Sequence, residues 1–522
     1  MSTFDVNKLN EKPPYADFVR DRSKIRYFKD KKEILSENYD AIVIGAGPIG
    51  AATATVLARD GRKILVVERS WNMPERFVGE LMQPGGIKAM EALGLADVFY
   101  GIGAVKVDGY YVGFKSSEVY IPYNTDKETG ARLQGASFHH GEFLMNIRAA
   151  CKAETNVTCL EAEVSELVKS PDLQRIVGVV VTESKGFKDT EAYLDNAADN
   201  IDEKKNENKQ YSIYAPLVIV VDGIYSKFRA DCAVAKKVKP RLISHFVAFT
   251  INHEKENPLP RPNNGHVFLQ GFTPILMYQM TDTETRVLVD VPGLKLPSQA
   301  SGALRKYITA AGHHLPEKVK EAYLSDLEKT KRLKVMTNSS LPSHKVSIYG
   351  AAFVGDSYNM RHPLTGAGMT VGMWDVYYLT KNLSRSQVKS FTDSKAVLEA
   401  LDHMYDQRRA RALVLNVLSV ALYSLFAADN DHYRNLRDAC FQYFQLGGDA
   451  IDGPSGLLSG TITNPIVLAY HFFAVAIYAM FLEICKAKSA TMILPHFFKS
   501  LYTLFVAAYI FIPLLLEEIL PS

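Results

Sequence analysis

Two glycine-bearing loops, far apart in the chain, hold the residues whose types and spacing best suggest chemistry. The first contains Gly45, Gly47 and Gly50 in the spacing G-x-G-x-x-G, and Glu68 follows 18 residues after Gly50. Such glycines allow a tight turn, close approach of a pyrophosphate and close packing of a helix on a strand. An acid at the position of Glu68 accepts hydrogen bonds from ribose hydroxyls. This loop therefore predicts a dinucleotide site and favours FAD or NAD over NADP.

The second loop, residues 355–370, reads GDSYNMRHPLTGAGMT. A strand is expected before it, so that the carboxylate of Asp356 would bond a ribityl hydroxyl. Gly366 and Gly368 open a predicted helix, whose N-terminal amides would face the flavin ring and favour negative charge there. Two loops that serve opposite ends of one extended cofactor select FAD over NAD.

Short apolar runs flank the first loop and would fix its position. Residues 41–44 read as a buried parallel strand, an alanine-rich stretch to Arg59 as a helix, and residues 63–67 as the next strand. Residues 215–229 add an apolar strand that ends in Asp222-Gly223, which is typical of flavoproteins with two dinucleotide folds. We therefore predict an α/β protein with a Rossmann-like FAD-binding domain.

Strand and helix patterns in the rest of the chain give the predicted domain order. Runs between residues 241 and 340 suit a mixed sheet in an α+β substrate domain, and the chain becomes helical after residue 381. The predicted parts are a polar N-terminal segment (1–37), FAD-binding parts at 38–120, 121–240 (with a polar insertion at 183–212) and 341–385, a substrate-binding domain (241–340), a helical region (386–464) and membrane-anchoring helices (465–522).

The composition argues against two classes of partner. A net charge of +3 over 522 residues is too small to indicate a polyanion, so we expect no nucleic acid. The five cysteines are scattered and odd in number, and the adjacent pair His139-His140 lacks the spacing of metal ligands. We expect reduced thiols in a cytosol-facing protein and no metal site.

The C-terminal region contains two long apolar stretches, residues 465–485 and 492–516. Each approaches the ~20 apolar residues that cross a bilayer, although His471 and Glu483 interrupt the first, and Pro495, His496, Lys499 and Pro513 interrupt the second. Three interpretations stay open: two membrane spans, a helical hairpin that dips into one leaflet, or helices buried in a soluble core. The N-terminal residues show no apolar stretch of the ~7–15 residues that a secretory signal needs, so the first domain is expected to fold in the cytosol.

Together these motifs resemble those of the squalene monooxygenase (squalene epoxidase) family, in its fungal form. The resemblance runs from about residue 39 to the C-terminus. The glycine loops alone would indicate only the wider superfamily of FAD-dependent flavoprotein monooxygenases. A narrower similarity lies in the segments RFVGELMQPGG, NMRHPLTG, FQLGG and GPSGLLSG.

The resemblance implies a set of FAD contacts at matching positions. Beyond the glycines, they are Pro48, Ile49, Glu68, Arg69, Arg76, Leu81, Arg148, Val164, Asp356 and Met369. Leu81, Met82 and Ala367 depart mildly from what is expected of the animal members.

The resemblance also implies the reaction, which is epoxidation of squalene to (3S)-2,3-oxidosqualene with O2 in sterol (ergosterol) biosynthesis. Reduced FAD would deliver oxygen to the terminal alkene as a C4a-hydroperoxide, so the protein need only bind, orient and exclude water. Tyr110 is the expected catalytic residue, since it would place a hydroxyl near the flavin, and His362 is expected to order the loop around the flavin. An apolar tunnel is implied at Leu364, Phe441, Phe444 and Pro454, with plain core packing as the alternative for each aromatic residue.

A single dinucleotide fingerprint is visible, so electrons would come from NADPH at a transient site or through a partner. The resemblance implies NADPH–cytochrome P450 reductase as that partner, at the cytosolic face of the endoplasmic reticulum membrane and on lipid droplets. Two other functions share the fold: an FAD-dependent polyprenyl reductase, which would consume no O2, and an FAD-stabilised membrane scaffold. Oxygen uptake coupled to squalene would separate the epoxidase from both.

Overall fold

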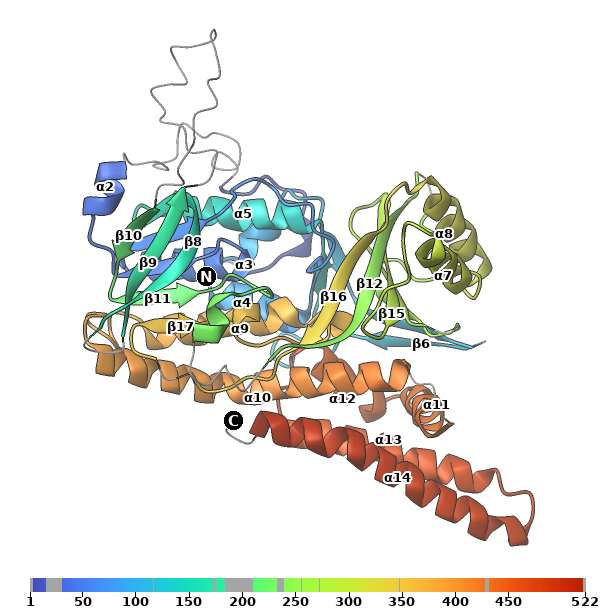
Figure 1. Ribbon diagram of the computed structural model, residues 1–522. Coiled ribbons are helices and arrows are strands. Elements are labelled where there is room, and N and C mark those ends of the chain that lie inside the picture. The colour runs from blue at the N-terminus through green and yellow to red at the C-terminus, as the bar shows by residue number, and fades with distance from the viewer. Residues whose placement is uncertain are drawn as a thin grey trace.

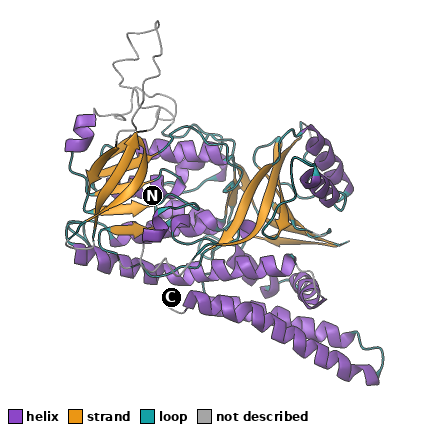
Figure 2. Ribbon diagram, viewed as in Figure 1, coloured by secondary structure: helices purple, strands orange, loops and turns teal. Residues whose placement is uncertain are grey.

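The structure is a computed structural model of the chain and describes residues 3–15, 31–115, 117–171, 175–183, 210–231, 239–254, 256–271, 273–346, 348–427 and 431–519. Two sheets lie side by side above a layer of long helices (Figures 1 and 2). Most of the polar insertion expected at residues 183–212 and part of the N-terminal segment lie outside the described residues.

The first sheet builds the predicted dinucleotide fold. Its order is β10-β9-β8-β2-β1-β11-β17, and the five strands from β8 to β17 are parallel. β1 and β11 are runs of four apolar residues that are buried throughout, as central parallel strands require. The strands are β1 (Ala41–Ile44), β2 (Ile64–Glu68), β8 (Val157–Lys169), β9 (Ile176–Glu183), β10 (Gln210–Tyr214), β11 (Leu217–Val220) and β17 (Ala351–Phe353).

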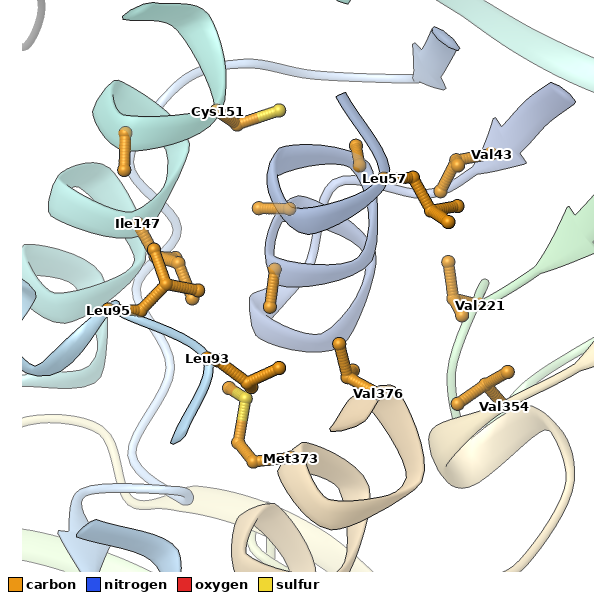
Figure 3. Close-up of a cluster of buried hydrophobic side chains, with 14 of the residues drawn as sticks. Val43, Leu57, Leu93, Leu95, Ile147, Cys151, Val221, Val354, Met373 and Val376 are labelled. Atoms are coloured by element: carbon orange, nitrogen blue, oxygen red, sulfur yellow. The ribbon is translucent and has the colours of Figure 1, made fainter. Parts of the chain in front are cut away.

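Three helices, α3, α5 and α9, cover one face of the first sheet and form the core shown in Figure 3. Val43, Leu57, Ile147 and Met373 meet in this core, although they come from four different elements. α3 begins at Pro48, a position where the fixed φ of proline suits a helix start. The helices of this domain are α3 (Pro48–Arg59), α4 (Pro84–Ala92), α5 (His140–Ala153) and α9 (Gly368–Asn382).

The second sheet has the order β16-β12-β15-β14-β13-β5-β6 and is antiparallel except for the pair β13 and β5. Helices α7 and α8 pack on one of its faces. β5 pairs with β13, a strand from much later in the chain, so β5 and β6 belong to this second sheet. Residues up to 120 were expected to belong to the first FAD-binding part. The elements are β5 (Gly109–Phe114), β6 (Ser117–Pro122), β12 (Arg241–Asn252), β13 (Gly265–Phe268), β14 (Ile275–Gln279), β15 (Glu284–Pro292), β16 (Lys334–Ser340), α7 (Ala303–Gly312) and α8 (Glu317–Lys329).

A third, three-stranded sheet contains part of the segment RFVGELMQPGG. Its order is β3-β7-β4, with strands β3 (Leu81–Met82), β4 (Val105–Val107) and β7 (Gly135–Ser137). The remaining short elements are α2 (Lys31–Ser36), η1 (Val6–Lys8), η3 (Ala96–Phe99), η4 (Phe228–Asp231), η5 (Gly355–Ser357) and η6 (Pro363–Thr365).

The C-terminal region is helical. α10 runs beneath both sheets, and α13 and α14 form a hairpin that projects from the body (Figure 1). α10, α13 and α14 are each long and apolar enough to cross a membrane, but protein buries 61% of the apolar window of α10 and only 28% and 33% of those of α13 and α14. Most of the apolar surface of the hairpin therefore lies outside the protein core, and this exposed apolar surface fits membrane association. The helices are α10 (Ser394–Phe426), α11 (Asp431–Gln445), α12 (Asp449–Leu458), α13 (Pro465–Cys485) and α14 (Ala490–Ile519).

Candidate active site

In the loop between β1 and α3, only one of the three glycines of the motif has free space beside its backbone. A Cβ atom at Gly45, where φ is +103°, would lie 2.8 Å from the carbonyl oxygen of Val221, and one at Gly50 would lie 2.0 Å from the carbonyl oxygen of Gly45. A Cβ atom at Gly47 would meet no atom within 4 Å. Since α3 begins at Pro48, its N-terminal amides are directed at the same open place. The loop therefore fits a pyrophosphate group.

Glu68 and Arg148 brace this loop from the side. Oε2 of Glu68 accepts a hydrogen bond from the backbone N–H of Ala46 (2.7 Å), and Nε of Arg148 donates to the carbonyl oxygen of Ala46 (2.8 Å). The two side chains form an ion pair at 3.7 Å. Burial lowers the pKa of Arg148, and the charge of Glu68 acts in the opposite direction. Glu68 ends β2, which is the position of the ribose-binding acid in dinucleotide folds.

The second glycine loop lies directly against the first. Ile49 in α3 makes the contact, because a Cβ atom at Gly355 would lie 3.3 Å from its Cγ1 and one at Gly372 would lie 2.5 Å from its Cδ1. Gly368 opens α9, and a Cβ atom there would meet no atom within 4 Å. Two segments about 300 residues apart in the sequence therefore form one site with two open glycines.

Asp356 lies in η5, where its side chain reaches solvent although neighbouring protein atoms partly desolvate its carboxyl group. Burial raises the pKa of its carboxyl group, while the positive charges of Arg361, Arg76 and Arg229 act in the opposite direction. Arg229 donates hydrogen bonds to the carbonyl oxygens of Ser357 and Asp356, each at 3.0 Å, and so fixes the turn. The arrangement suits a hydroxyl ligand at the carboxylate.

Gln83 connects Tyr110 to the second glycine loop. Its side-chain oxygen accepts hydrogen bonds from the hydroxyls of Tyr110 (2.8 Å) and Tyr123 (2.6 Å), and its amide donates to the carbonyl oxygen of Thr365 (2.9 Å). Burial raises the pKa of both tyrosines, so both stay protonated and act as donors. Gln83 was not predicted as a site residue, although it lies in the segment RFVGELMQPGG, because no spacing rule identifies a side chain that bridges three segments.

His362 has a defined partner at each ring nitrogen. Nδ1 accepts from the backbone N–H of Leu364 (3.2 Å), so Nε2 holds the proton and donates to Oγ of Ser244 (3.0 Å). Ser244 donates to one oxygen of Asp290 (2.6 Å), and Tyr423 donates to the other (3.0 Å). Burial lowers the pKa of His362 to about 3 and raises that of Asp290 to about 6. The link from His362 to the second sheet through Ser244 and Asp290 was not predicted.

The residues expected to line a hydrocarbon site fall in adjoining apolar regions. Tyr110, Phe441 and Phe444 belong to one buried cluster and Leu364 to another. Pro454 lies buried inside α12, which packs against β6. The structure thus brings β5, α11, α12 and the second glycine loop into one apolar neighbourhood.

The other expected cofactor contacts are distributed unevenly. Leu81 packs against both apolar clusters, and Sδ of Met369 lies 3.7 Å from the position of a Cβ atom at Gly79. Arg69 is exposed. The side chain of Val164 is buried in a cluster on the sheet face away from α3, and Tyr358 of the second glycine loop belongs to the same cluster.

The two neighbouring histidines have separate surroundings. His139 contacts Glu284 at 2.6 Å, whereas Nδ1 of His140 bonds the carbonyl oxygen of Gly79 at 3.0 Å. Burial lowers the pKa of His140 to about 4, and its buried Nε2 has no protein partner among the described residues. His140 and Met369 both lie beside Gly79. The unpartnered Nε2 of His140 therefore suits a hydrogen bond from a polar group of a bound cofactor. The described residues contain no group of three or more metal-ligating side chains.

Comparison with known proteins places these features in a family. The family model of squalene epoxidase matches residues 214–497. The chain is 38% identical to the squalene epoxidase of Candida albicans, over 93% of this chain and 99% of that one. It is 39% identical to the squalene monooxygenase of Mus musculus, over 92% of this chain and 78% of that one.

Solved structures of more distant proteins share the fold. The p-nitrophenol 4-monooxygenase PnpA of Pseudomonas putida superposes with a TM-score of 0.59 at 16% identity, covering 81% of this chain and 97% of that one. A variant of HpxO from Klebsiella pneumoniae, complexed with FAD, superposes with a TM-score of 0.58 at 16% identity, covering 80% and 98%. The predicted fold class is thereby confirmed. The identity to the curated relatives over nearly the whole length goes further: this chain belongs to the squalene epoxidase family.

Proposed function

We propose that this protein is an FAD-dependent squalene epoxidase, which converts squalene to (3S)-2,3-oxidosqualene with O2 in sterol biosynthesis. The observation that carries the proposal is the meeting of the apolar clusters around Tyr110 and Leu364 with the second glycine loop, in a chain of this family. The exposed apolar hairpin suits a substrate that is itself a membrane-soluble hydrocarbon.

FAD is the cofactor that fits the two loops. The open backbone at Gly47 and the start of α3 would hold its pyrophosphate, and Glu68 would accept from the adenosine ribose. Asp356 would bond the ribityl chain, and the N-terminus of α9 would face the flavin ring. When bound and reduced, FAD supplies the activation of O2 and the transfer of one oxygen atom.

The remaining work falls to residues that position and shield. Gln83 holds the Thr365 carbonyl and the hydroxyl of Tyr110 in one hydrogen-bonded unit, so Tyr110 orders the loop that would lie beside the flavin. The side chains of Leu364, Phe441 and Phe444 offer an apolar wall for the alkene. Exclusion of water at this wall keeps activated oxygen from being released as hydrogen peroxide.

We further propose that NADPH–cytochrome P450 reductase supplies the electrons, at the cytosolic face of the endoplasmic reticulum membrane and on lipid droplets. The proposal is supported by the single dinucleotide fingerprint in the sequence, which leaves NADPH without a second G-x-G-x-x-G loop, and by the membrane-associated hairpin. Omission of the reductase should then abolish turnover with NADPH.

The decisive experiment combines the purified full chain in detergent with FAD, NADPH, the reductase and squalene under isotopically labelled O2. We expect O2 uptake that depends on squalene and a product with one labelled oxygen atom, identified by mass. Reduction of an isoprenoid chain without O2 uptake would indicate a polyprenyl reductase instead. No turnover with any of these additions would favour the scaffold.

A further inference from the structure

The end of the second hairpin helix is buried in the catalytic body. Glu518, in the last turn of α14, has a relative exposure of 6%. Its Oε1 accepts a hydrogen bond from Nδ2 of Asn416 (2.9 Å), and its Oε2 accepts one from Oγ of Ser343 (3.0 Å). A carboxylate is costly to bury, so its retention at the end of an apolar helix calls for a role beyond membrane contact.

Asn416 links Glu518 to Arg361 of the second glycine loop. Its Oδ1 accepts a hydrogen bond from Nε of Arg361 (2.7 Å). Nη1 of Arg361 in turn donates to the carbonyl oxygen of Gly368 (3.1 Å), the first residue of α9. Three consecutive hydrogen bonds therefore lead from Glu518 to the N-terminus of α9, which forms one wall of the candidate site.

The same network balances buried charge. Arg408 pairs with Asp375 of α9 through two hydrogen bonds, at 2.6 and 3.1 Å. Oδ1 of Asn359 accepts from all three neighbouring donors, those of Arg361, Arg408 and Asn416. The cluster thus holds the guanidinium groups of Arg361 and Arg408 together with the carboxylates of Asp375 and Glu518.

We propose that Glu518 is a positioning residue for the FAD site, so that the membrane-anchoring hairpin is also part of the cofactor-binding structure. The inference rests on the proposed function, because it needs FAD at the second glycine loop. Glu518 fixes the orientation of the Asn416 amide, the amide fixes Arg361, and Arg361 holds the Gly368 carbonyl.

The neighbouring acid Glu517 provides a matched control. It pairs with Arg241 at the surface, where the two side chains are 32% and 61% exposed. It is adjacent in sequence and lies on the same helix, but its partner Arg241 is the first residue of β12 in the second sheet.

The test uses the full chain in detergent and measures the FAD dissociation constant and the absorption spectrum of the bound flavin. Glu518→Ala should weaken FAD binding about tenfold and alter the flavin spectrum, since a hydrogen bond to a charged group is lost. Glu518→Gln keeps an acceptor for Asn416 and should stay within about threefold of the wild type. Glu517→Ala should leave both readouts unchanged, and all variants should bind phosphatidylcholine vesicles equally.

Combining Glu518→Ala with Asn416→Ala shows whether the loss of FAD affinity depends on Asn416. In an Asn416→Ala chain, Glu518→Ala should cause no further loss of FAD affinity. Glu518→Asp retains the charge but shortens the side chain, so it should give the same loss as alanine in a folded protein. Wild-type FAD affinity in the alanine or aspartate variant, or an equal loss in both backgrounds, would overturn the inference. A wild-type chain that binds no FAD would instead refute the proposed function.

Discussion

Asp356 and Asp290 are both carboxylates near the candidate site, and their surroundings give them different tasks. Asp356 faces solvent on a turn held by Arg229, so it is available to a hydroxyl ligand. Asp290 is fully buried and accepts from Ser244 and Tyr423, so it serves as the end of a hydrogen-bond chain. Residue type alone does not separate these tasks, whereas burial and partners do.

The first residue-level prediction concerns cofactor retention. Asp356→Ala removes the acceptor proposed for the ribityl chain, so FAD binding should weaken at least about tenfold, in line with about 1.5 to 3 kcal/mol for a hydrogen bond to a charged group. Bound flavin is measured by absorbance after gel filtration. Asp356→Asn keeps one acceptor oxygen, so its FAD content should lie between those of the wild type and the alanine variant. Full flavin content in the alanine variant would show that the assignment is wrong.

Tyr110→Phe tests the role of the hydroxyl that bonds Gln83. Loss of one buried hydrogen bond of about 1 kcal/mol should lower epoxidation about fivefold, because the loop at Thr365 is held less firmly. FAD content should stay unchanged. Tyr111→Phe is the control, since its hydroxyl bonds Glu118 and its ring packs in the core of the second sheet with α7 and α8. Equal turnover in the Tyr110 variant and the wild type would remove this hydroxyl from the mechanism.

The raised pKa of Asp290 makes a prediction about pH and stability. Burial raises this pKa from its ordinary value of 3.8 to about 6, so the folded protein binds the proton more tightly than the unfolded chain. The group therefore favours the folded state most at low pH, and this contribution is lost as pH rises from about 4 through 6, by about 3 kcal/mol at most.

Asp290→Asn should remove that dependence. Melting temperatures of the variant and the wild type at pH 5 and pH 7 provide the comparison, because all other carboxyl groups titrate in both proteins. The wild type should lose more stability than the variant between these two values. Parallel behaviour would mean that Asp290 does not titrate in this range.

At the scale of elements, the segment before β3 is tied to the second sheet by a buried ion pair. Arg286 of β15 forms two hydrogen bonds with Glu80, each at 2.8 Å, and Tyr278 of β14 donates to the same carboxylate at 3.0 Å. The side chains of Glu80 and Arg286 are 0% and 10% exposed. Since Gln83 follows three residues later, this pair also fixes the strand that presents Gln83 to Tyr110.

Glu80→Ala should destabilise the protein by about 3 to 5 kcal/mol, because it leaves the Arg286 guanidinium buried without its carboxylate. The free energy of unfolding or the melting temperature measures this change. Glu256→Ala is the matched control: its pair with Lys318 lies on the surface of the same domain, so its removal should cost less than about 1 kcal/mol. A loss at Glu80 as small as that at Glu256 would show that the pair does not hold the segment.

Local geometry explains which elements could be predicted from the sequence. The first glycine loop, its flanking strands and α3 follow from apolar runs and glycine spacing, and these predictions agree with the structure. The same holds for α13, whose bounds match the predicted apolar stretch. The pairing of β5 with β13 was missed, because strand pairing depends on a partner about 150 residues away and no local pattern encodes it.

Without the family resemblance, reasoning from the sequence could name site residues only where the residue type itself signals the chemistry. Glycines, Glu68 and Asp356 belong to that group. Gln83, Ser244 and Asn416 do not, because a neutral polar residue becomes functional only through its partners in space.

For the whole molecule, α10 joins the two sheets into one body. This helix of 33 residues spans about 50 Å. Arg408, near the middle of α10, donates to Asp375 in the FAD-binding domain. Tyr423, near the end of α10, donates to Asp290 in the second sheet. Asn416 of the same helix donates to Glu518 of the hairpin, so α10 contacts the FAD-binding domain, the second sheet and the hairpin.

The hairpin should bind membranes through its exposed aromatic side chains. Phe498 and Phe505 on α14 are 62% and 61% exposed. Their joint replacement by serine should lower partition onto vesicles by tenfold or more, since burial of each phenylalanine in lipid contributes about 1.5 to 3 kcal/mol. FAD content should not change. Tyr225→Ser, at a 79% exposed position on the catalytic body, is the control in the same flotation assay. Unchanged partition in the double variant would rule out this face as the membrane contact.

The strand order of the first sheet also sets when the protein can become active during its synthesis. β1 and its glycine loop are made early, but β17, the loop after it and α9 follow about 300 residues later. At a ribosomal rate of roughly 5 to 20 residues per second, this delay is about 15 to 60 s. A nascent chain therefore holds half of a nucleotide site, with one open sheet edge, until α9 has been made, which ends at residue 382 of 522.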